Sequence, residues 1–476
     1  MIYSRLVLAV AFAFSFSDVL TAQSGTPISQ SDMPWTSPGS GTYFLSEDVR
    51  QPKGLALNIQ HDNVTVLLNG HTVQWGVNGD GMMIDINNHD NVTLRGPGRF
   101  VQGDANPALD FTENARIEGT NITIDGGIQF ILKATPRVRG SRSFFRGGGN
   151  DSSVIRDCSF DISGDGYYYL LNHVGHYKFL TNEVRVHDWT HSSKWWYSKM
   201  FRDCQATEFG HNVIDIGKVH NTNVWIAWGD DDYHIHHNTV RFAAIHGRIV
   251  LADQGCKNWL VEHNNITVTS DTPPQRAVYA FMVRVPNGGT TEPSTGHKFL
   301  YNELDMTAAS GALAGFTFGD SNYQSDVVIQ NNIFRGISRL MLFPGGTTNN
   351  IDVSCNQFIH DHDRGYAIVV QGGSSAADFS NNLWQTRRSD NILMHGTGAL
   401  NWTMCDNEGF ADSSRMSTSV GGVTFTSESA CGNVGAPDCW QNAGSDVEPA
   451  PPLPPAPPPP PPTLTKPLPP SNIRIE

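Results

Sequence analysis

The feature that most restricts the fold is a short recurring segment: two alternating apolar residues, an asparagine and a further apolar residue, as in YKFLTNEV at 177–184. The aligned asparagines lie 24 to 38 residues apart, at Asn182, Asn212, Asn238, Asn264, Asn302, Asn332, Asn356, Asn382 and Asn407. A repeat of this length is typical of a solenoid, in which every coil contacts only its neighbours. The chain is therefore expected to grow coil by coil rather than to enclose one large core.

Each repeat predicts a coil of three short strands. Alternation, as in Tyr177–Leu180, indicates a half-buried strand, and asparagine tolerates the left-handed conformation of a sharp corner, where its amide can bond to the next coil. A second strand starts after the corner, and a third precedes the asparagine by 10–14 residues, as in Val224–Trp228. Since no helical pattern separates the strands, they are expected to stack in parallel by coiling. This predicts an all-β fold, a right-handed single-stranded parallel β-helix of roughly 12–13 coils.

Composition divides the chain into further segments. An apolar run, Leu6–Phe16, follows Arg5, so residues 1–22 are expected to be a secretory signal peptide cleaved near Ala22. Residues 23–50 are expected to be an N-terminal cap, 51–410 the β-helix and 411–447 a C-terminal cap. Residues 448–470 are mostly proline, which predicts a stiff linker, and 471–476 a tail or the start of a further module. We expect a secreted or periplasmic monomer without a membrane span, because no other run reaches the ~18 apolar residues of a spanning helix.

Cysteine positions and net charge narrow the chemistry. The chain has seven cysteines, and export permits disulfides. Cys431 and Cys439 lie close together beyond the last repeat and are expected to pair, whereas Cys158, Cys355 and Cys405 fall at repeat corners and are expected to be buried thiols. The net charge of −14 disfavours nucleic acid as a partner, because affinity for phosphate depends mainly on lysine and arginine.

The repeats, together with the Leu-Asn-Gly-His-Thr-Val segment at 68–73, resemble those of the pectate-lyase-like right-handed parallel β-helix proteins over about residues 58–410. The resemblance implies the fold. It leaves the activity open, because this superfamily includes polysaccharide lyases, glycoside hydrolases, epimerases, esterases and adhesive proteins. Gly229-Asp230-Asp231 and His246–Ile249 are similar to elements of polygalacturonases, with Val250 at the position where those enzymes have lysine.

Outward strand positions carry aromatic and basic residues on consecutive coils. Thirteen residues before three successive repeat asparagines lie Tyr169, Lys199 and Trp225. Because stacked strands lie about 4.8 Å apart, we expect a stripe of aromatic rings around Lys199, which could stack on the faces of sugar rings. The alternative is that loops cover these rings as a second core. The expected aromatic contacts to a ligand are Tyr167, Tyr169, Trp225 and Phe145.

Basic residues gather beside this stripe. Five of them occur within fourteen residues that contain no acid: Lys133, Arg137, Arg139, Arg142 and Arg146. In a chain of net charge −14, a local basic strip indicates an anionic ligand such as a uronic-acid or sulfated polysaccharide. Arg142 and Arg146 are therefore expected to bind substrate. The alternative is a solvated loop.

A further polar cluster follows Trp228 and contains Asp230, Asp231, Asp232, His234, His236 and His237. The three aspartates could bind Ca²⁺ through oxygen ligands, and neighbouring histidines could bind a softer metal. The alternative is a polar turn with no cofactor.

These observations favour a polysaccharide lyase that acts by β-elimination on an acidic polysaccharide. The reaction must neutralise the uronate carboxylate, remove the α-proton and protonate the leaving oxygen. The expected catalytic residues are Lys199, Tyr197, His246, Arg248 and Arg284. One alternative is a glycoside hydrolase that uses two of Asp230, Asp231 and Asp253. The other is a solenoid that binds glycans without cleaving them.

Overall fold

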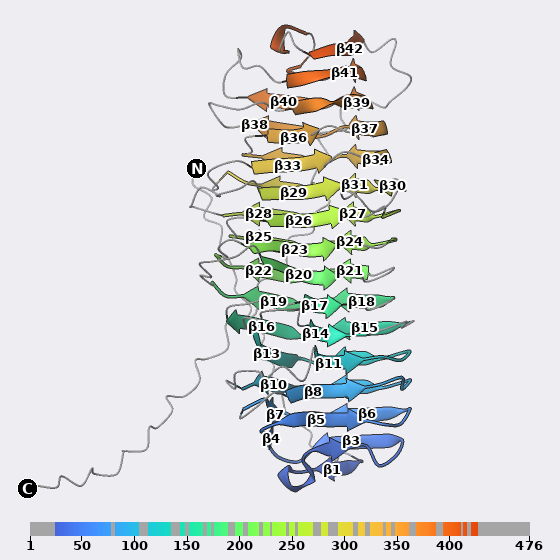
Figure 1. Cartoon of the computed structure of the whole chain (residues 1–476), viewed down its shortest axis with the longest axis vertical. Helices are drawn as coiled ribbons and strands as arrows, with labels where there is room; N and C mark the ends of the chain where they lie inside the picture. The colour runs from blue at the N-terminus through green and yellow to red at the C-terminus, as the bar shows by residue number, and fades with distance from the viewer. Residues whose placement is uncertain are drawn as a thin grey trace, which may run out of the picture.

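Strands stack along one long axis in a parallel β-helix, as the computed structural model shows (Figure 1). No helix in the described part of the chain is long and apolar enough to cross a membrane. The structure describes residues 24–77, 81–103, 113–134, 143–147, 152–164, 169–172, 176–188, 196–202, 208–218, 222–228, 231–243, 247–252, 256–269, 278–283, 294–307, 313–318, 324–336, 339–343, 348–360, 368–386, 394–410, 413–416 and 420–426.

Successive coils contribute strands to three faces, as the repeat predicts. The first face contains β2 (Trp35–Thr36), β5 (Gly54–Ile59), β8 (Gly81–Ile86), β11 (Glu113–Ile117), β14 (Ser143–Arg146), β17 (Tyr169–Asn172), β20 (Trp196–Arg202), β23 (Thr222–Trp228), β26 (Gly247–Ala252), β29 (Val278–Val283), β33 (Leu313–Phe318) and β36 (Arg339–Phe343).

The second face contains β1 (Thr26–Ile28), β3 (Gly41–Leu45), β6 (Val64–Leu67), β9 (Thr93–Arg95), β12 (Thr123–Asp125), β15 (Ser153–Arg156), β18 (Tyr177–Leu180), β21 (Glu208–Gly210), β24 (His234–His236), β27 (Leu260–Glu262), β30 (Ser294–Thr295), β31 (Lys298–Leu300), β34 (Gln324–Gln330) and β37 (Thr348–Ser354). Long strands continue both faces toward the C-terminus: β39 (Ile368–Ser380), β41 (Met394–Cys405) and β42 (Val420–Thr426).

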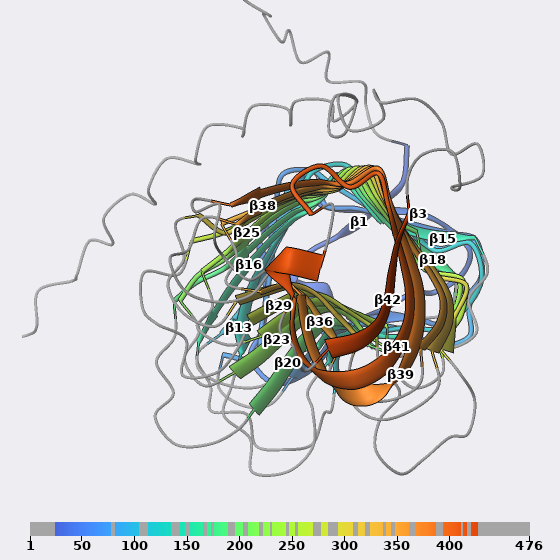
Figure 2. The ribbon, with the colours of Figure 1, turned by 90° about the horizontal axis from the view of Figure 1, so that it is seen from above.

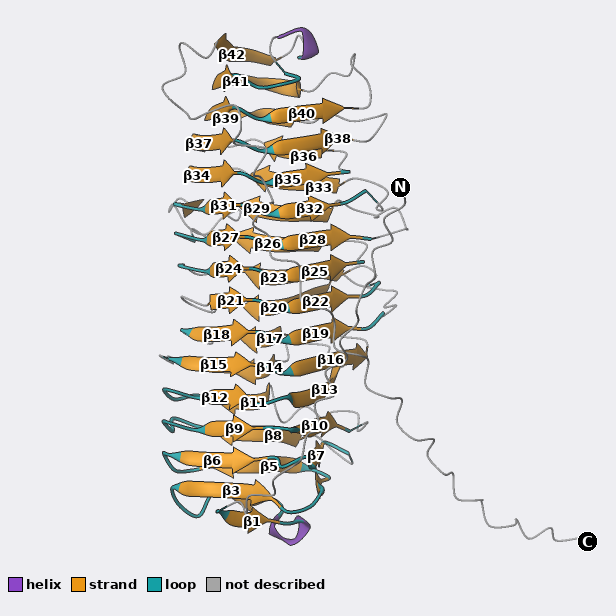
Figure 3. Cartoon of the chain, turned by 180° about the vertical axis from the view of Figure 1, so that it is seen from behind, coloured by secondary structure: helices purple, strands orange, loops and turns teal. Residues whose placement is uncertain are grey.

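The third face is a separate sheet of 13 strands in chain order, which agrees with the predicted number of coils. Its strands follow those of the second face around each coil (Figure 3). They are β4 (Val49–Gln51), β7 (Thr72–Trp75), β10 (Gly98–Gln102), β13 (Ile128–Ala134), β16 (Ser159–Gly164), β19 (Glu183–Val186), β22 (Val213–Ile216), β25 (Thr239–Phe242), β28 (Asn265–Val268), β32 (Glu303–Asp305), β35 (Ile333–Arg335), β38 (Gln357–His360) and β40 (Leu383–Thr386). Two short 3₁₀ helices, η1 (Gln30–Asp32) and η2 (Ser413–Arg415), complete the described elements.

The interior is a continuous apolar core in which equivalent side chains of successive coils stack on one another. Viewed along the axis, the three faces surround this core (Figure 2). Phe130 stacks on Phe100 and on Phe160, with ring centroids 5.5 Å and 4.9 Å apart. Near the C-terminal end, Phe358 stacks on Trp384 at 4.2 Å. Aromatic stacking of this kind adds to the gain from apolar burial and keeps consecutive coils in register.

The predicted asparagine ladder runs along the corner between the second and third faces. All nine repeat asparagines, from Asn182 to Asn407, are buried. Asn238 is typical: its side-chain amide donates to Asn264 Oδ1 at 2.9 Å and to the Phe209 carbonyl at 3.0 Å. The left-handed residue of the corner is, however, the one before the asparagine, as at His211 (φ 56°) and His237 (φ 52°). The asparagine therefore contributes its hydrogen bonds to the corner, and its neighbour makes the turn.

The β-helix extends beyond its expected limits at both ends. Within 24–50, expected as a cap, β1 pairs with β3 and β4 pairs with β7 in the same parallel register as later coils. Beyond residue 410, β42 still pairs with β41. Alternation too short to register as a repeat is thus enough to add a strand to an existing sheet.

Two of the corner cysteines differ from expectation. Cys355 and Cys405 are disulfide-bonded, so the prediction that they are thiols is wrong. Cys158 is a buried free thiol as expected, and burial raises its pKa. The predicted Cys431–Cys439 pair lies outside the described residues.

Candidate functional site

The first face brings three of the predicted site residues to one line parallel to the helix axis. Tyr169 of β17 pairs with Lys199 of β20, and Lys199 pairs with Trp225 of β23. This is the register expected from counting back from the repeat asparagines. Adjacent strands of a sheet lie about 4.8 Å apart, so the three positions follow one another at that interval.

The same line continues through positions that include a fourth predicted residue. Val224 pairs with Gly247, which places Arg248 beside Trp225, and Arg248 in turn pairs with Tyr279. The register then passes through Ala314 to Arg339. We call this row the register line; its positions are Tyr169, Lys199, Trp225, Arg248, Tyr279, Ala314 and Arg339.

Tyr279 and Arg339 were not identified from the sequence. Counting back from the repeat asparagines depends on a constant distance between strand and corner, and the interval from Asn264 to Asn302 is 38 residues, the longest of the series. The extra residues displace Tyr279 from the position at which the count looks for it. The only sequence signal for Tyr279 is its aromatic side chain, on the first-face strand that follows the one containing Arg248.

The prediction that Phe145 contacts substrate is wrong. Its ring is only 1% exposed and packs in the core against Phe130 at 5.3 Å. Strict alternation fails on this face because two consecutive residues of the strand are buried: Phe144 with Phe145, as also Leu170 with Leu171. The residue of β14 that pairs with Tyr169 is Ser143, and Phe145 pairs with the buried Leu171.

A second row of positions begins one residue after the buried pair. Arg146 is exposed and pairs in register with Arg116 on one side and Asn172 on the other. Asn172 pairs with Arg202. Three of these four positions are arginines, and they lie three residues along the strand from the register line, in the same sheet. Of the basic strip predicted from the sequence, Arg137, Arg139 and Arg142 lie outside the described residues, and its last member, Arg146, has Arg116 one coil before it and Arg202 two coils after it.

The other predicted site residues fall into two groups. Tyr197 lies in β20, two residues before Lys199, and pairs with Asn223. The remainder lie outside the described residues: Tyr167, Arg142, His246, Arg284, Asp230 and Asp253.

Asp231 and Asp232 hold the next coil in place. The Asp231 carboxylate accepts a hydrogen bond from the backbone N–H of Lys257 at 2.7 Å, and the Asp232 carboxylate accepts one from the side-chain amide of Asn258 at 3.0 Å. Asp232 also has a left-handed backbone, with φ 61°. These contacts are those of a polar turn, and Ca²⁺ binding at this segment stays a prediction.

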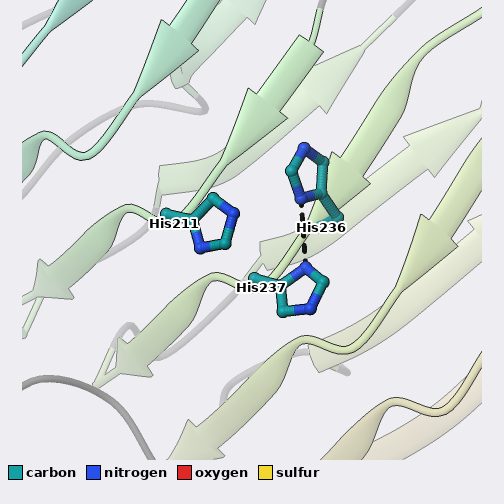
Figure 4. A group of neighbouring side chains, drawn as sticks. All are labelled: His211, His236 and His237. Atoms are coloured by element: carbon teal, nitrogen blue, oxygen red, sulfur yellow. Dashed lines mark hydrogen bonds between the residues drawn. The ribbon is translucent and has the colours of Figure 1, made fainter. Parts of the chain in front are cut away.

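Three histidines from two coils form a compact group at the corner between the second and third faces. His211 follows β21, while His236 ends β24 and His237 comes directly after it (Figure 4). Each offers one nitrogen, and these atoms all lie within 4.8 Å of one another. His236 and His237 belong to the polar cluster predicted from the sequence, whereas His211 does not, although the aligned segments TEFGHNVI and YHIHHNTV place His211 and His237 at the same repeat position.

An ion pair supports this group from one side. Glu208 contacts Lys178 at 2.6 Å and His236 Nε2 at 3.3 Å, and the lysine is the main reason why the pKa of Glu208 is lowered. Burial, followed by the charge of His234, lowers the pKa of His236 to about 4. Gly210 leaves room for the imidazole, since a Cβ at that position would overlap the His236 ring.

The corner rings also stack along the axis. His237 stacks on His211 at 4.8 Å and on His263 at 4.9 Å, and His263 stacks on Tyr301 at 4.9 Å. All four residues have positive φ, because each occupies the left-handed position of its coil. The repeat thus holds these rings at the strand spacing.

No protein-family profile and no curated protein matches the sequence. One solved structure, described as "a new PL6 alginate lyase complex with trisaccharide", is similar with a TM-score of 0.30 and 11% sequence identity, over 85% of this chain and 90% of that chain. A similarity of this size carries no information about the activity of this chain.

Proposed function

We propose that this protein is a polysaccharide lyase that cleaves an acidic, uronate-containing polysaccharide by β-elimination on the first face of the helix. The observation that supports the proposal is the register line, in which basic Lys199 and Arg248 alternate with aromatic Tyr169 and Trp225 on four consecutive coils. Aromatic residues suit the faces of sugar rings, and the basic residues suit their carboxylates.

The proposed reaction assigns one task to each group. Arg248 binds the uronate carboxylate through its planar fork and neutralises its charge, which makes the α-proton more acidic. The Lys199 amine removes that proton, and the electron pair forms the new carbon–carbon double bond as the glycosidic C–O bond breaks. Tyr197, on the same strand, protonates the departing oxygen. Lys199 and Arg248 lie two strand spacings apart, about 10 Å between backbones, which their long side chains can bridge toward one sugar unit.

Of the three aspartates in the hydrolase alternative only Asp231 lies within the described residues, and its contacts do not favour a hydrolase. Asp231 has its carboxylate engaged by a backbone N–H of the following coil. An inverting hydrolase needs an acid and a base free to exchange protons with substrate and water. The lyase is therefore the function that the described residues support best.

Incubation with alginate, pectate, glycosaminoglycans and sulfated algal glycans tests the proposal. Ultraviolet absorbance of the unsaturated product and release of reducing ends are followed together. A lyase produces both signals on at least one uronate-containing glycan. Reducing ends alone would indicate hydrolysis, and binding without either signal would indicate a glycan-binding solenoid; both results would overturn the proposal.

A further inference from the structure

We propose that His211, His236 and His237 bind a divalent transition-metal ion of the Zn²⁺ class at the corner between the second and third faces. This site goes beyond the proposed lyase function, because it lies on other strands than the register line. We refer to the three residues as the corner histidines.

The spacing of the ring nitrogens suits one ion. His236 Nδ1 and His237 Nδ1 lie 3.1 Å apart. Two nitrogens bound to a tetrahedral Zn²⁺ at about 2.0–2.1 Å would lie about 3.3 Å apart. His211 supplies a third nitrogen within 4.8 Å of the others. Small ring rotations would therefore bring three imidazoles, the preferred ligands of zinc and copper, onto a single ion.

A supporting carboxylate orients the central ligand. His236 Nε2 lies 3.3 Å from Glu208, which is itself held by Lys178 at 2.6 Å. When Nε2 donates its hydrogen to this carboxylate, Nδ1 presents its lone pair toward His237. Metal-binding histidines commonly have such a partner on the other ring nitrogen, which fixes their tautomer and orientation.

The fold holds the ligands in place before any ion binds. His211 and His237 occupy equivalent left-handed positions on consecutive coils and their rings are stacked 17° from parallel. His236 is only 7% exposed, with its ring over Gly210. His211 is exposed, which leaves a solvent-facing position for a water ligand. An ion here would link two neighbouring coils.

A second set of ligands, Glu208, His234 and His236, lies close by. Two of its members already have partners: Glu208 pairs with Lys178, and His234 Nε2 lies 2.9 Å from Glu262. Binding an ion there would require both pairs to separate. The corner histidines leave both of these pairs intact and already hold two ring nitrogens 3.1 Å apart, so they are the favoured set.

Calorimetric titration of the chelator-treated full chain with Zn²⁺ tests the proposal, with Co²⁺ absorption spectra to report nitrogen coordination. We expect one ion per chain. His211→Gln and His237→Gln should each weaken binding by more than about 100-fold, exceeding the 10–100-fold cost of losing a supporting group. Glu208→Gln should weaken it within that smaller range. Both histidine variants replace residues that are not fully buried, so circular dichroism should confirm that they fold.

His263→Gln is the matched control, because His263 belongs to the same stacked row but not to the ligand set. The affinity of this variant for Zn²⁺ should equal that of the wild type. Wild-type affinity in the His211→Gln/His237→Gln double variant would overturn the proposal. So would loss of binding in His234→Gln alone, which would place the ion in the other set. Zn²⁺ affinity should also be unchanged in Lys199→Ala, so the test of the metal site does not depend on the proposed lyase activity.

Discussion

The asparagine ladder allows the cost of one substitution to be worked out from individual hydrogen bonds. The Asn238 side chain donates to the Phe209 carbonyl at 3.0 Å and to Asn264 Oδ1 at 2.9 Å. Its own Oδ1 accepts from the backbone N–H and from the side-chain amide of Asn212, both at 2.9 Å. Asn238→Leu removes these four bonds while keeping a side chain of similar size.

Not every partner would be left unsatisfied. Asn212 Nδ2 still donates to the Phe179 carbonyl, and Asn264 Oδ1 still accepts from the backbone N–H of residue 238. The Asn212 N–H loses its bond altogether, whereas Phe209 stays paired within the sheet. A buried polar group left without a partner costs about 1–3 kcal/mol, and this is the expected loss in the free energy of unfolding. The other lost bonds and the burial of the leucine act in opposite directions.

Urea unfolding followed by circular dichroism measures this loss, and faster hydrogen exchange at the Asn212 amide would locate it. Asn401→Leu is the matched control, because Asn401 is exposed on β41 and should change stability by less than about 0.5 kcal/mol. In the Asn238→Leu/Asn264→Leu double variant the shared amide bond is lost only once, so the total should fall short of the sum of the single losses. An Asn238→Leu variant as stable as the wild type would refute the ladder as a stabilising element.

Three further predictions concern single residues. Lys199→Ala should lower turnover at least about 100-fold on a glycan that the wild type cleaves. Lys298 is exposed on the second face, so Lys298→Ala should be fully active. Equal initial rates for Lys199→Ala and the wild type would count against the register line. Burial lowers the pKa of His297 from 6.5 to about 3, so the unfolded state binds the proton more tightly than the folded state. The free energy of unfolding should therefore fall as the pH falls below about 6.5, and this group should account for a loss of about 3 kcal/mol at pH 4.5, measured by denaturant unfolding at each pH. His297→Gln should flatten that acid limb; an unchanged slope would assign it to other groups. Gly210→Ala should lower the melting temperature, because its Cβ would overlap the ring of His236, and an unchanged melting temperature would show that the ring moves aside at little cost.

The repeat asparagines made most of the architecture predictable. Their phase located the second and third faces, and counting back from them aligned Tyr169, Lys199 and Trp225 correctly. This works because one buried asparagine per coil, bonded to the next, leaves a coil no freedom to slip. The position of each repeat asparagine in the sequence therefore predicts which residue of the next coil it contacts.

The errors arose where a coil departs from simple alternation. Phe145 was assigned to the surface because two successive inward residues, Phe144 and Phe145, shift the alternation by one. Tyr279 was missed because a longer connection lies within its coil, and His211 because its partners come from the next coil, 25 and 26 residues later. Side chains that meet only through stacking leave no mark in a linear window, unless the repeats are first aligned beneath one another.

The left-handed position before each ladder asparagine can carry different side chains without a change in the backbone of its coil. Its backbone hardly varies, with φ between 47° and 58° from Thr181 to Asp406, while its side chains include hydroxyl, imidazole, phenol, amide, thiol-derived and carboxylate groups. Each non-glycine residue there costs roughly 1–2 kcal/mol relative to an ordinary conformation, and the stacked neighbours must absorb that cost. Duplication of a coil would move everything beyond it by one unit without altering its immediate surroundings. Any function that requires His211 beside His237 therefore depends on which coils are adjacent, and a single inserted coil between them would separate the pair while leaving the rest of the helix intact.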